Sequence, residues 1–217
     1  MQTIHAADRV LDRPEGADAD AVAVDGGLIV AAGPYERLVA ERPQARVRRW
    51  PGLLLPGLRH PQAVPLLEGA YHPDPREAGE LGTEPLTGDA LEALAMDDTR
   101  WGASARRGLQ RLMAHGVTAL DGPFTHPAVR TAVARSGLGV RVPLKGSRHE
   151  VTALALDPLV HFPLNALLDG DLSVGAPAAF AVFDVPVGEL PDHALRLRGT
   201  GSCVATVLGG RLVHRAR

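Results

Sequence analysis

Two β-hairpin patterns stand at opposite ends of this chain. Residues 20–33, DAVAVDGGLIVAAG, place two β-rich runs around an Asp-Gly-Gly turn, and residues 203–215, CVATVLGGRLVHR, place two more around a Gly-Gly turn. Glycine permits the positive φ that the tight turn of a hairpin requires. Because an isolated hairpin cannot bury a face by itself, we expect residues 1–52 and 170–217 to pack together as one small β-sandwich.

Between these ends, helical and strand patterns alternate. Apolar residues at helical spacing, followed by glycine, predict helices over 99–116 and 126–137. Alternation of helices with short apolar runs favours parallel βα units within residues 53–169. The runs that predict strands are VTAL at 117–120, VRVPL at 140–144 and VTALAL at 151–156.

Composition excludes several classes of protein. The 217 residues are 45% hydrophobic and 22% charged, with a formal net charge of -2 at pH 7. These values are typical of a globular protein with one domain, or with one domain and a second, smaller domain. The small negative net charge offers no positive surface for a nucleic-acid backbone. No apolar stretch approaches the ~20 residues of a membrane span, and the first residues lack the regions of a signal peptide. We therefore expect a cytoplasmic protein with neither a nucleic-acid nor a membrane partner.

Four segments carry a resemblance to a known family: AVAVDGGLIVAAGPYERL, WPGLLLPGL, GDLSVGAPAAFAVFDVP and VATVLGGRLVHR. In this order they resemble the amidohydrolase superfamily, especially its imidazolonepropionase and aminodeoxyfutalosine deaminase branch. The resemblance implies a composite β-sandwich domain, built here from 1–52 and 170–217, with a metal-bearing (β/α) barrel between its halves. About 115 residues separate the halves, whereas a complete barrel takes about 250. We therefore expect residues 53–169 to form a truncated α/β domain, a shortened and incomplete barrel.

The resemblance fails at the family's first metal ligands, two histidines separated by one residue. Without a gap, their positions fall on Gln62 and Val64, and His60 stands two residues too early. The missing half of the barrel also removes the region in which the family carries its later metal-binding histidine and its catalytic aspartate. We therefore expect neither a metal nor another cofactor.

Polar residues that follow predicted strands or lie in the central loop form a candidate binding pocket. His60 and Gln62 follow a buried apolar run, and His72 and Asp74 lie in residues 67–88, which predict a long loop with short helical turns. Strand ends are where α/β proteins place ligands. The alternative is structural: a surface histidine in a turn beside proline, and a rigid His-Pro-Asp-Pro turn.

Asp121 and His126 are the candidate catalytic residues, because Asp121 ends a predicted strand and His126 opens a predicted helix. The alternative is again structural, since aspartate before glycine favours a turn and Thr125 is suited to cap the helix. Lys145 and His149 belong to a loop that we interpret as solvated. The candidate ligands, if a metal binds, are His60, His72, Asp74 and His126.

Two functions from different classes remain open. The first is a non-catalytic or metal-site-degenerate amidohydrolase relative that acts in binding or scaffolding. The second is a zinc-dependent hydrolase or deaminase acting on non-peptide carbon–nitrogen bonds of a cyclic amidine or amino-substituted heterocycle, for which the resemblance implies a link to futalosine-type menaquinone biosynthesis. We expect the first, because the missing ligand pair and the missing half-barrel are independent defects.

An incomplete barrel leaves strand edges and apolar faces that a closed barrel would cover. We therefore expect a homodimer or a stable complex with another subunit, together with a small-molecule ligand.

Overall fold

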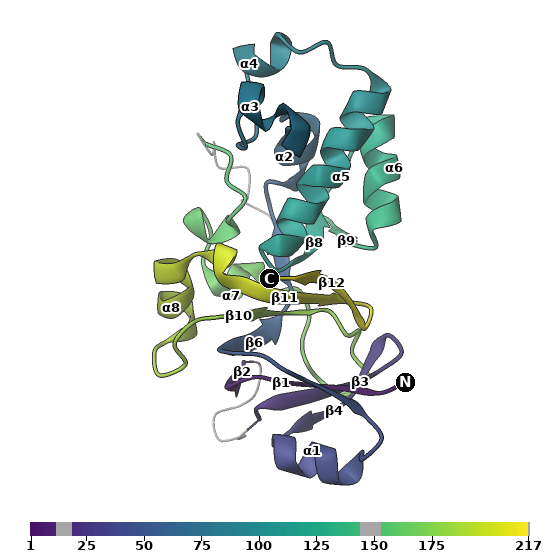
Figure 1. The fold of residues 1–217 in the computed structure, drawn as a ribbon, viewed down its shortest axis with the longest axis vertical. Helices are drawn as coiled ribbons and strands as arrows, with labels where there is room; N and C mark the ends of the chain where they lie inside the picture. The colour runs from purple at the N-terminus through teal and green to yellow at the C-terminus, as the bar shows by residue number, and fades with distance from the viewer. Residues whose placement is uncertain (12–18, 144–152, 217) are drawn as a thin grey trace.

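The computed structural model describes residues 1–11, 19–143 and 153–216, and its elements are stacked in layers along the long axis of the molecule (Figure 1). Two sheets lie next to each other, and a small parallel sheet with its helices lies beyond the second. In spatial order, the first sheet contains β4 (Leu28–Gly33), β3 (Ala21–Asp25), β1 (Thr3–Ala6) and β5 (Arg46–Arg49). The second contains β12 (Arg211–Arg215), β11 (Cys203–Leu208), β10 (Phe180–Phe183), β6 (Leu53–Pro56) and β2 (Arg9–Val10). The third contains β7 (Leu58–His60), β8 (Val117–Asp121) and β9 (Gly139–Arg141).

Helices connect and cover these sheets. The α-helices are α1 (Tyr35–Glu41), α2 (Ala63–Glu68), α3 (Ala78–Leu81), α4 (Asp89–Glu92), α5 (Asp98–Ala114), α6 (Pro127–Ser136), α7 (Leu164–Leu167) and α8 (Pro191–Arg198). The short 3-10 helices are η1 (Pro75–Glu77), η2 (Pro158–Val160) and η3 (Thr200–Ser202). No described helix is long and apolar enough to cross a membrane.

Both hairpins predicted from the sequence are confirmed. β3 pairs antiparallel with β4, and β11 pairs antiparallel with β12. Gly26, Gly209 and Gly210 in the two turns have positive φ values of 60°, 55° and 73°. The two long helices of the middle segment are confirmed as α5 and α6, and each is followed by a glycine in the left-handed region, Gly116 and Gly137.

Side chains from both ends of the chain form the core between the first two sheets. Val22 and Ile29 come from the first sheet, whereas Leu54, Phe180 and Val207 come from the second. The faces that face each other are therefore made by segments far apart in the sequence. The assignment of 1–52 and 170–217 to one composite domain, with 53–169 as a second, stays a prediction.

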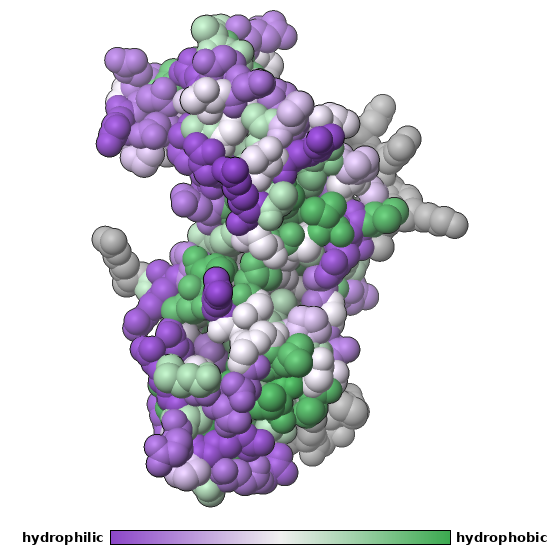
Figure 2. Space-filling view, turned by 90° about the vertical axis from the view of Figure 1, so that its right-hand side faces the viewer, coloured by the Kyte–Doolittle hydropathy of each residue, from purple (hydrophilic) through white to green (hydrophobic). Residues whose placement is uncertain are grey.

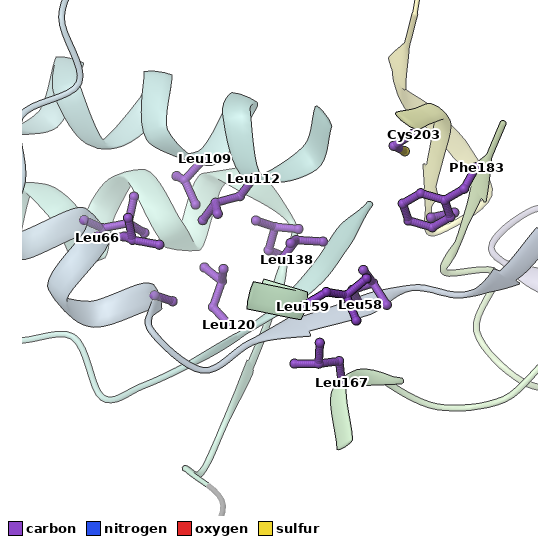
Figure 3. Packing of buried hydrophobic residues seen from close by; sticks show 14 of the residues in the cluster. Leu58, Leu66, Leu109, Leu112, Leu120, Leu138, Leu159, Leu167, Phe183 and Cys203 are labelled. Carbon is purple, nitrogen blue, oxygen red and sulfur yellow. The ribbon is translucent and has the colours of Figure 1, made fainter. Parts of the chain in front are cut away.

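The central strand β10 of the second sheet is buried on both faces, because its alternate residues belong to two different cores. Phe180 and Val182 belong to the core shared with the first sheet, whereas Ala181 and Phe183 belong to the core formed by α5, α6 and the parallel sheet. Figure 3 shows Phe183 and Cys203 near leucines of the middle segment. Burial on both faces explains the continuous apolar sequence of this strand, which the sequence alone shows as an unbroken run.

The parallel sheet has three described strands and no closed barrel among the described residues. The strand predicted at 151–156 is wrong for residues 153–156, which form no strand, whereas residues 151–152 lie outside the described part. The apolar run at 53–56 enters the second sheet as β6, antiparallel to β10. The chain enters the parallel sheet at Leu58, where β7 begins, and Gly57 alone lies between β6 and β7.

Candidate functional site

The carboxyl ends of β7, β8 and β9 meet at one edge of the parallel sheet. The register pairs His60 with Leu120, and Asp121 with Arg141. This edge therefore gathers His60 and Asp121, although each side chain is engaged by a different part of the protein.

His60 is fully buried, and both of its ring nitrogens bind backbone groups. Nε2 donates to the carbonyl oxygen of Ala155 at 3.1 Å, and Nδ1 accepts the amide N–H of Gln62 at 3.2 Å. Burial lowers the pKa of His60 from 6.5 to about 4, so the ring is neutral at physiological pH. The prediction of a surface histidine in a turn is wrong for this residue, because β7 carries it into the interior.

Gln62 lies just before α2 and is also buried. Its side-chain Nε2 donates to the carbonyl oxygen of Ala153 at 3.2 Å, whereas its Oε1 has no hydrogen-bond partner among the described residues. His60 and Gln62 thus both hold the segment that begins at residue 153 against the end of β7. Residues 153–156 form no strand, so hydrogen bonds from the side chains of His60 and Gln62 hold their backbone in place of strand pairing.

Asp121 is 2% exposed and forms an ion pair with Arg59 of the neighbouring strand. Arg59 also donates to the carbonyl oxygen of Val142. One carboxylate oxygen of Asp121, Oδ2, has no partner among the described residues. The ion pair with Arg59 occupies one carboxylate oxygen of Asp121, so that oxygen is not available as a metal ligand while the pair persists.

His72 is buried between α2 and α5, away from His60. Its Nε2 donates to the carbonyl oxygen of Leu66 at 2.9 Å, and burial lowers its pKa to about 4. A Cβ added to Gly108 of α5 would lie 2.6 Å from the Nε2 of His72, so the glycine permits the close approach. His72 is therefore a packing residue that joins the central loop to α5.

Asp74 lies in the same loop and has the structural role that was the alternative prediction. Its side chain accepts the amide N–H of Arg76 at 3.0 Å and caps η1, with Glu77 completing a capping box. Arg107 of α5 lies 3.5 Å from the carboxylate of Asp74. The loop with short helical turns predicted at 67–88 is confirmed by η1 and α3.

Sequence reasoning missed Glu68, which holds the start of α6. Its carboxylate accepts the amide N–H of Thr125 at 2.6 Å, the hydroxyl of Thr125 at 2.9 Å and the amide N–H of His126 at 2.7 Å. The prediction that Thr125 caps this helix is wrong, because His126 occupies the N-cap position and Thr125 bonds to Glu68. The two residues are 57 positions apart, and no local pattern reveals such a contact.

His126 is placed by this contact beside Trp101, with ring centroids 5.3 Å apart. Its Nε2 lies 3.8 Å from a carboxylate oxygen of Asp98, and its Nδ1 is buried without a described partner. His126 thus contacts α5 rather than the strand-end residues His60 and Asp121. The predicted metal ligands and catalytic residues do not converge on one point.

A network missed at the sequence level surrounds Tyr71. Its hydroxyl donates to Glu77 at 2.5 Å, and the guanidinium groups of Arg100 and Arg107 lie 4.9 Å and 5.4 Å from its ring centroid. Arg100 also binds Glu77 at 3.2 Å. The arginines of α5 and the acidic residues of the loop could have indicated ion pairs between these two segments. Sequence spacing does not show which loop carboxylate each arginine contacts.

A cleft opens beside α2, next to the segment held by His60 and Gln62. Its volume is about 590 Å³. It is lined by Pro65, Gly69, Glu84, Pro85, Thr87, Ala153 and Leu154. Gln62 reaches its wall indirectly, through the hydrogen bond to the backbone of Ala153. The walls combine prolines and leucine with one carboxylate, Glu84, which lies 3.6 Å from Arg111.

The described residues contain no group of three or more histidine, cysteine, aspartate or glutamate side chains that could hold a metal ion. Of the further residues considered at the sequence level, Lys145 and His149 lie outside the described part. The arrangement therefore does not fit the three protein ligands and open position of a catalytic zinc site.

Neither a family model nor a curated protein matches this sequence. Solved structures match in part. An amidohydrolase from a Sargasso Sea environmental sample has a TM-score of 0.41 and 17% identity over 72% of this chain and 37% of that chain. A zinc-bound adenosine deaminase from Xanthomonas campestris has a TM-score of 0.40 and 18% identity over 64% and 33%. Helicobacter pylori aminofutalosine deaminase has a TM-score of 0.37 and 19% identity over 65% and 33%.

This chain thus spans only about a third of the length of these solved structures. At such TM-scores the likeness assigns neither a family nor an activity to the chain.

Proposed function

We propose that this protein acts by binding a small organic molecule and not by metal-dependent hydrolysis. The observation that carries the proposal is the state of His60. A histidine binds a metal through the lone pair of one ring nitrogen, but in His60 the Nδ1 lone pair accepts the amide of Gln62 and Nε2 donates its hydrogen to Ala155. His60, the histidine nearest in sequence to the positions of the family's ligand pair, therefore already uses both ring nitrogens in hydrogen bonds to the backbone.

The other candidates support the same conclusion. His72 uses its Nε2–H for the carbonyl of Leu66 in α2. Asp121 is paired with Arg59, and His126 lies against Trp101. A set of three ligands that includes His60, His72 or Asp121 would break the backbone hydrogen bond of that histidine or the ion pair between Asp121 and Arg59. Breaking a largely buried ion pair is unfavourable.

The cleft beside α2 is the proposed binding site. Proline and leucine side chains offer apolar contact for a flat ring, and the carboxylate of Glu84 offers an acceptor for N–H groups. A cyclic amidine or amino-substituted heterocycle, the class that the sequence resemblance implies, combines both features. Such a ligand would rest against the segment at 153–154 that Gln62 holds in place.

Metal analysis tests the first half of this proposal. Protein purified without a nickel column should carry far less than one equivalent of zinc, iron or manganese, and its melting temperature should not respond to a chelator, because no ligand set is preformed among the described residues. His60→Gln should be more stable than His60→Ala, since glutamine can still donate to Ala155. The proposal would be contradicted if the wild type carried stoichiometric metal that is lost in His60→Ala or His126→Ala, and if a chelator lowered its melting temperature. That result would support the alternative function, a zinc-dependent hydrolase.

Ligand-observed NMR tests the second half, with adenine as the probe for an amino-substituted heterocycle. Thr87→Trp fills the cleft from an exposed position and should remove the saturation-transfer signal. Thr83→Trp is the matched control, because Thr83 is exposed on the same loop but does not line the cleft. Equal signals from both variants would place the ligand elsewhere, and no signal from the wild type would exclude this class of ligand.

A second copy of the chain remains our proposed partner. Among the described residues, β9 pairs only with β8, and Val140 and Val142 beside this edge are 49% and 85% exposed. The face seen in Figure 2, the side on which α6 and β9 lie, carries apolar areas across its middle between more hydrophilic ends. A two-fold axis at this edge would cover the same residues in both copies.

Light scattering at micromolar concentration should therefore give the mass of a dimer, and Val142→Lys should shift it to a monomer because the charge would be buried at the contact. Val174→Lys, at an exposed valine away from β9, is the control and should remain dimeric. A wild-type monomer would contradict the proposal. The cytoplasmic location expected from the sequence stays a prediction.

A further inference from the structure

Two arginines of the edge strand β5 face the second sheet. Arg48 is the register partner of His5 in the parallel pair of β5 with β1, and His5 packs edge-on against Phe180 of the second sheet, with ring centroids 5.0 Å apart. Partners in adjacent strands share a face, and alternate residues share it too. Arg46 is therefore on this face as well, about 7 Å from Arg48 along the strand. Arg49 is on the opposite face, where its guanidinium lies 4.1 Å from the ring centroid of Tyr35.

A third arginine reaches the same place from the other end of the chain. Arg215 of β12 pairs with Ala205, whose side chain belongs to the core between the two sheets. Its guanidinium lies 5.9 Å from the ring centroid of Trp50, the residue that follows β5. Trp50 in turn donates its Nε1–H to Nδ1 of His5 at 3.3 Å. Trp50 and His5 are thus hydrogen-bonded to each other beside Arg48 and Arg215, and we call this pair the floor of the group.

No carboxylate of the described residues neutralises this group. Arg46, Arg48 and Arg215 form no ion pair with any described residue, whereas Arg100, Arg107 and Arg111 of α5 each meet a carboxylate. The pKa of Arg48 is lowered by partial burial and then by the positive charges of Arg46 and Arg215. Like charges brought together without counterions repel, and an oxyanion between them would remove that repulsion.

We propose that Arg46, Arg48 and Arg215, together with this floor, form a binding site for a small phosphorylated molecule at the open edge between the two sheets. A guanidinium presents two parallel N–H donors that match two oxygens of a phosphate. Forks contributed by two sheets can engage different oxygens of one phosphate or of a diphosphate. The site lies apart from the cleft beside α2 and does not depend on the function proposed for it.

Calorimetric titration with inorganic phosphate and with pyrophosphate tests the site at ionic strength held constant with chloride. Pyrophosphate should bind saturably, and more tightly than phosphate because it carries more charge. Arg48→Gln and Arg215→Gln should each weaken binding by about tenfold, the effect of one charge-assisted contact at a partly exposed site. Arg49→Gln removes the same charge from the next position but on the opposite face, and should leave the affinity within about twofold of the wild type.

Three outcomes would overturn the proposal. Heats no larger than those of matched chloride would show that the arginines are only solvated. Equal weakening in Arg49→Gln and Arg48→Gln would show general attraction to net positive charge and not a site. Binding to phosphatidate vesicles without binding to pyrophosphate would move the ligand from a small molecule to a lipid surface. Circular dichroism of each variant shows whether the fold is retained, and Arg46→Gln provides a further site variant if Arg215→Gln is unstable.

Discussion

At about pH 5 we expect the folded protein to be about 6 kcal/mol less stable to unfolding than at about pH 7.5. Three buried histidines cause this loss. Burial lowers the pKa values of His5, His60 and His72 from the ordinary 6.5 to about 4. Burial also lowers the pKa of His115, which acts in the same direction.

The sign follows from proton binding. As pH falls through 6.5, these histidines become protonated in the unfolded chain, but in the folded protein they stay neutral until pH approaches about 4. The unfolded state therefore binds more protons in this window and is favoured. The stabilisation is fully present above pH 6.5 and is lost as pH falls toward 4, by about 2 kcal/mol per histidine at about pH 5.

Urea unfolding followed by tryptophan fluorescence over this pH range measures the effect. Replacing His5, His60 and His72 one at a time by glutamine removes one titrating group each, so each variant should lose about a third of the pH dependence. His193→Gln, at a position on the surface of α8, is the control and should follow the wild type. A free energy of unfolding that is flat between about pH 7.5 and about pH 5 would contradict the assigned burial of these rings.

Gly52→Ala should lower the free energy of unfolding by about 4 kcal/mol. Gly52 joins the first sheet to β6 of the second, with φ of +75°. An added Cβ would overlap the carbonyl oxygen of Phe183 and lie 2.8 Å from the amide nitrogen of Val185. Both are backbone atoms that cannot rotate away, and the amide of Gly52 itself donates to Asp8 at 2.6 Å. The added methyl group would therefore strain the backbone at Gly52 and push it away from Phe183 and Val185.

Gly82→Ala is the matched control because Gly82 has nearly the same φ, +72°, but no atom within 4 Å of an added Cβ. Its cost should be about 2 kcal/mol, the backbone strain alone, because φ of 72° with ψ of -167° is a region that residues with a Cβ rarely adopt. Chemical denaturation of both variants separates strain from overlap. Equal costs for the two variants would show that Phe183 and Val185 do not approach Gly52 as described.

What the sequence by itself determined is local in character. Glycine turns specified both hairpins, and apolar spacing closed by Gly116 and Gly137 specified α5 and α6, since turn chemistry and periodicity act between neighbouring residues. Asp74 as a turn-capping residue was open to the same kind of reasoning. The helix α8 was missed, although Pro191 at its first position is a helix-start signal.

Only the tertiary structure decided the chemistry of the candidate site. His60 is neutral because it is buried, and both of its ring nitrogens are bonded because a segment nearly a hundred residues later supplies the carbonyl oxygen of Ala155. Glu68 likewise holds the start of α6 across 57 positions. Arg215 of β12 lies beside Trp50, which follows β5, only because the sheet that contains β12 packs against the sheet that contains β5. A side chain's burial and partners depend on segments distant in sequence, and no local pattern contains that information.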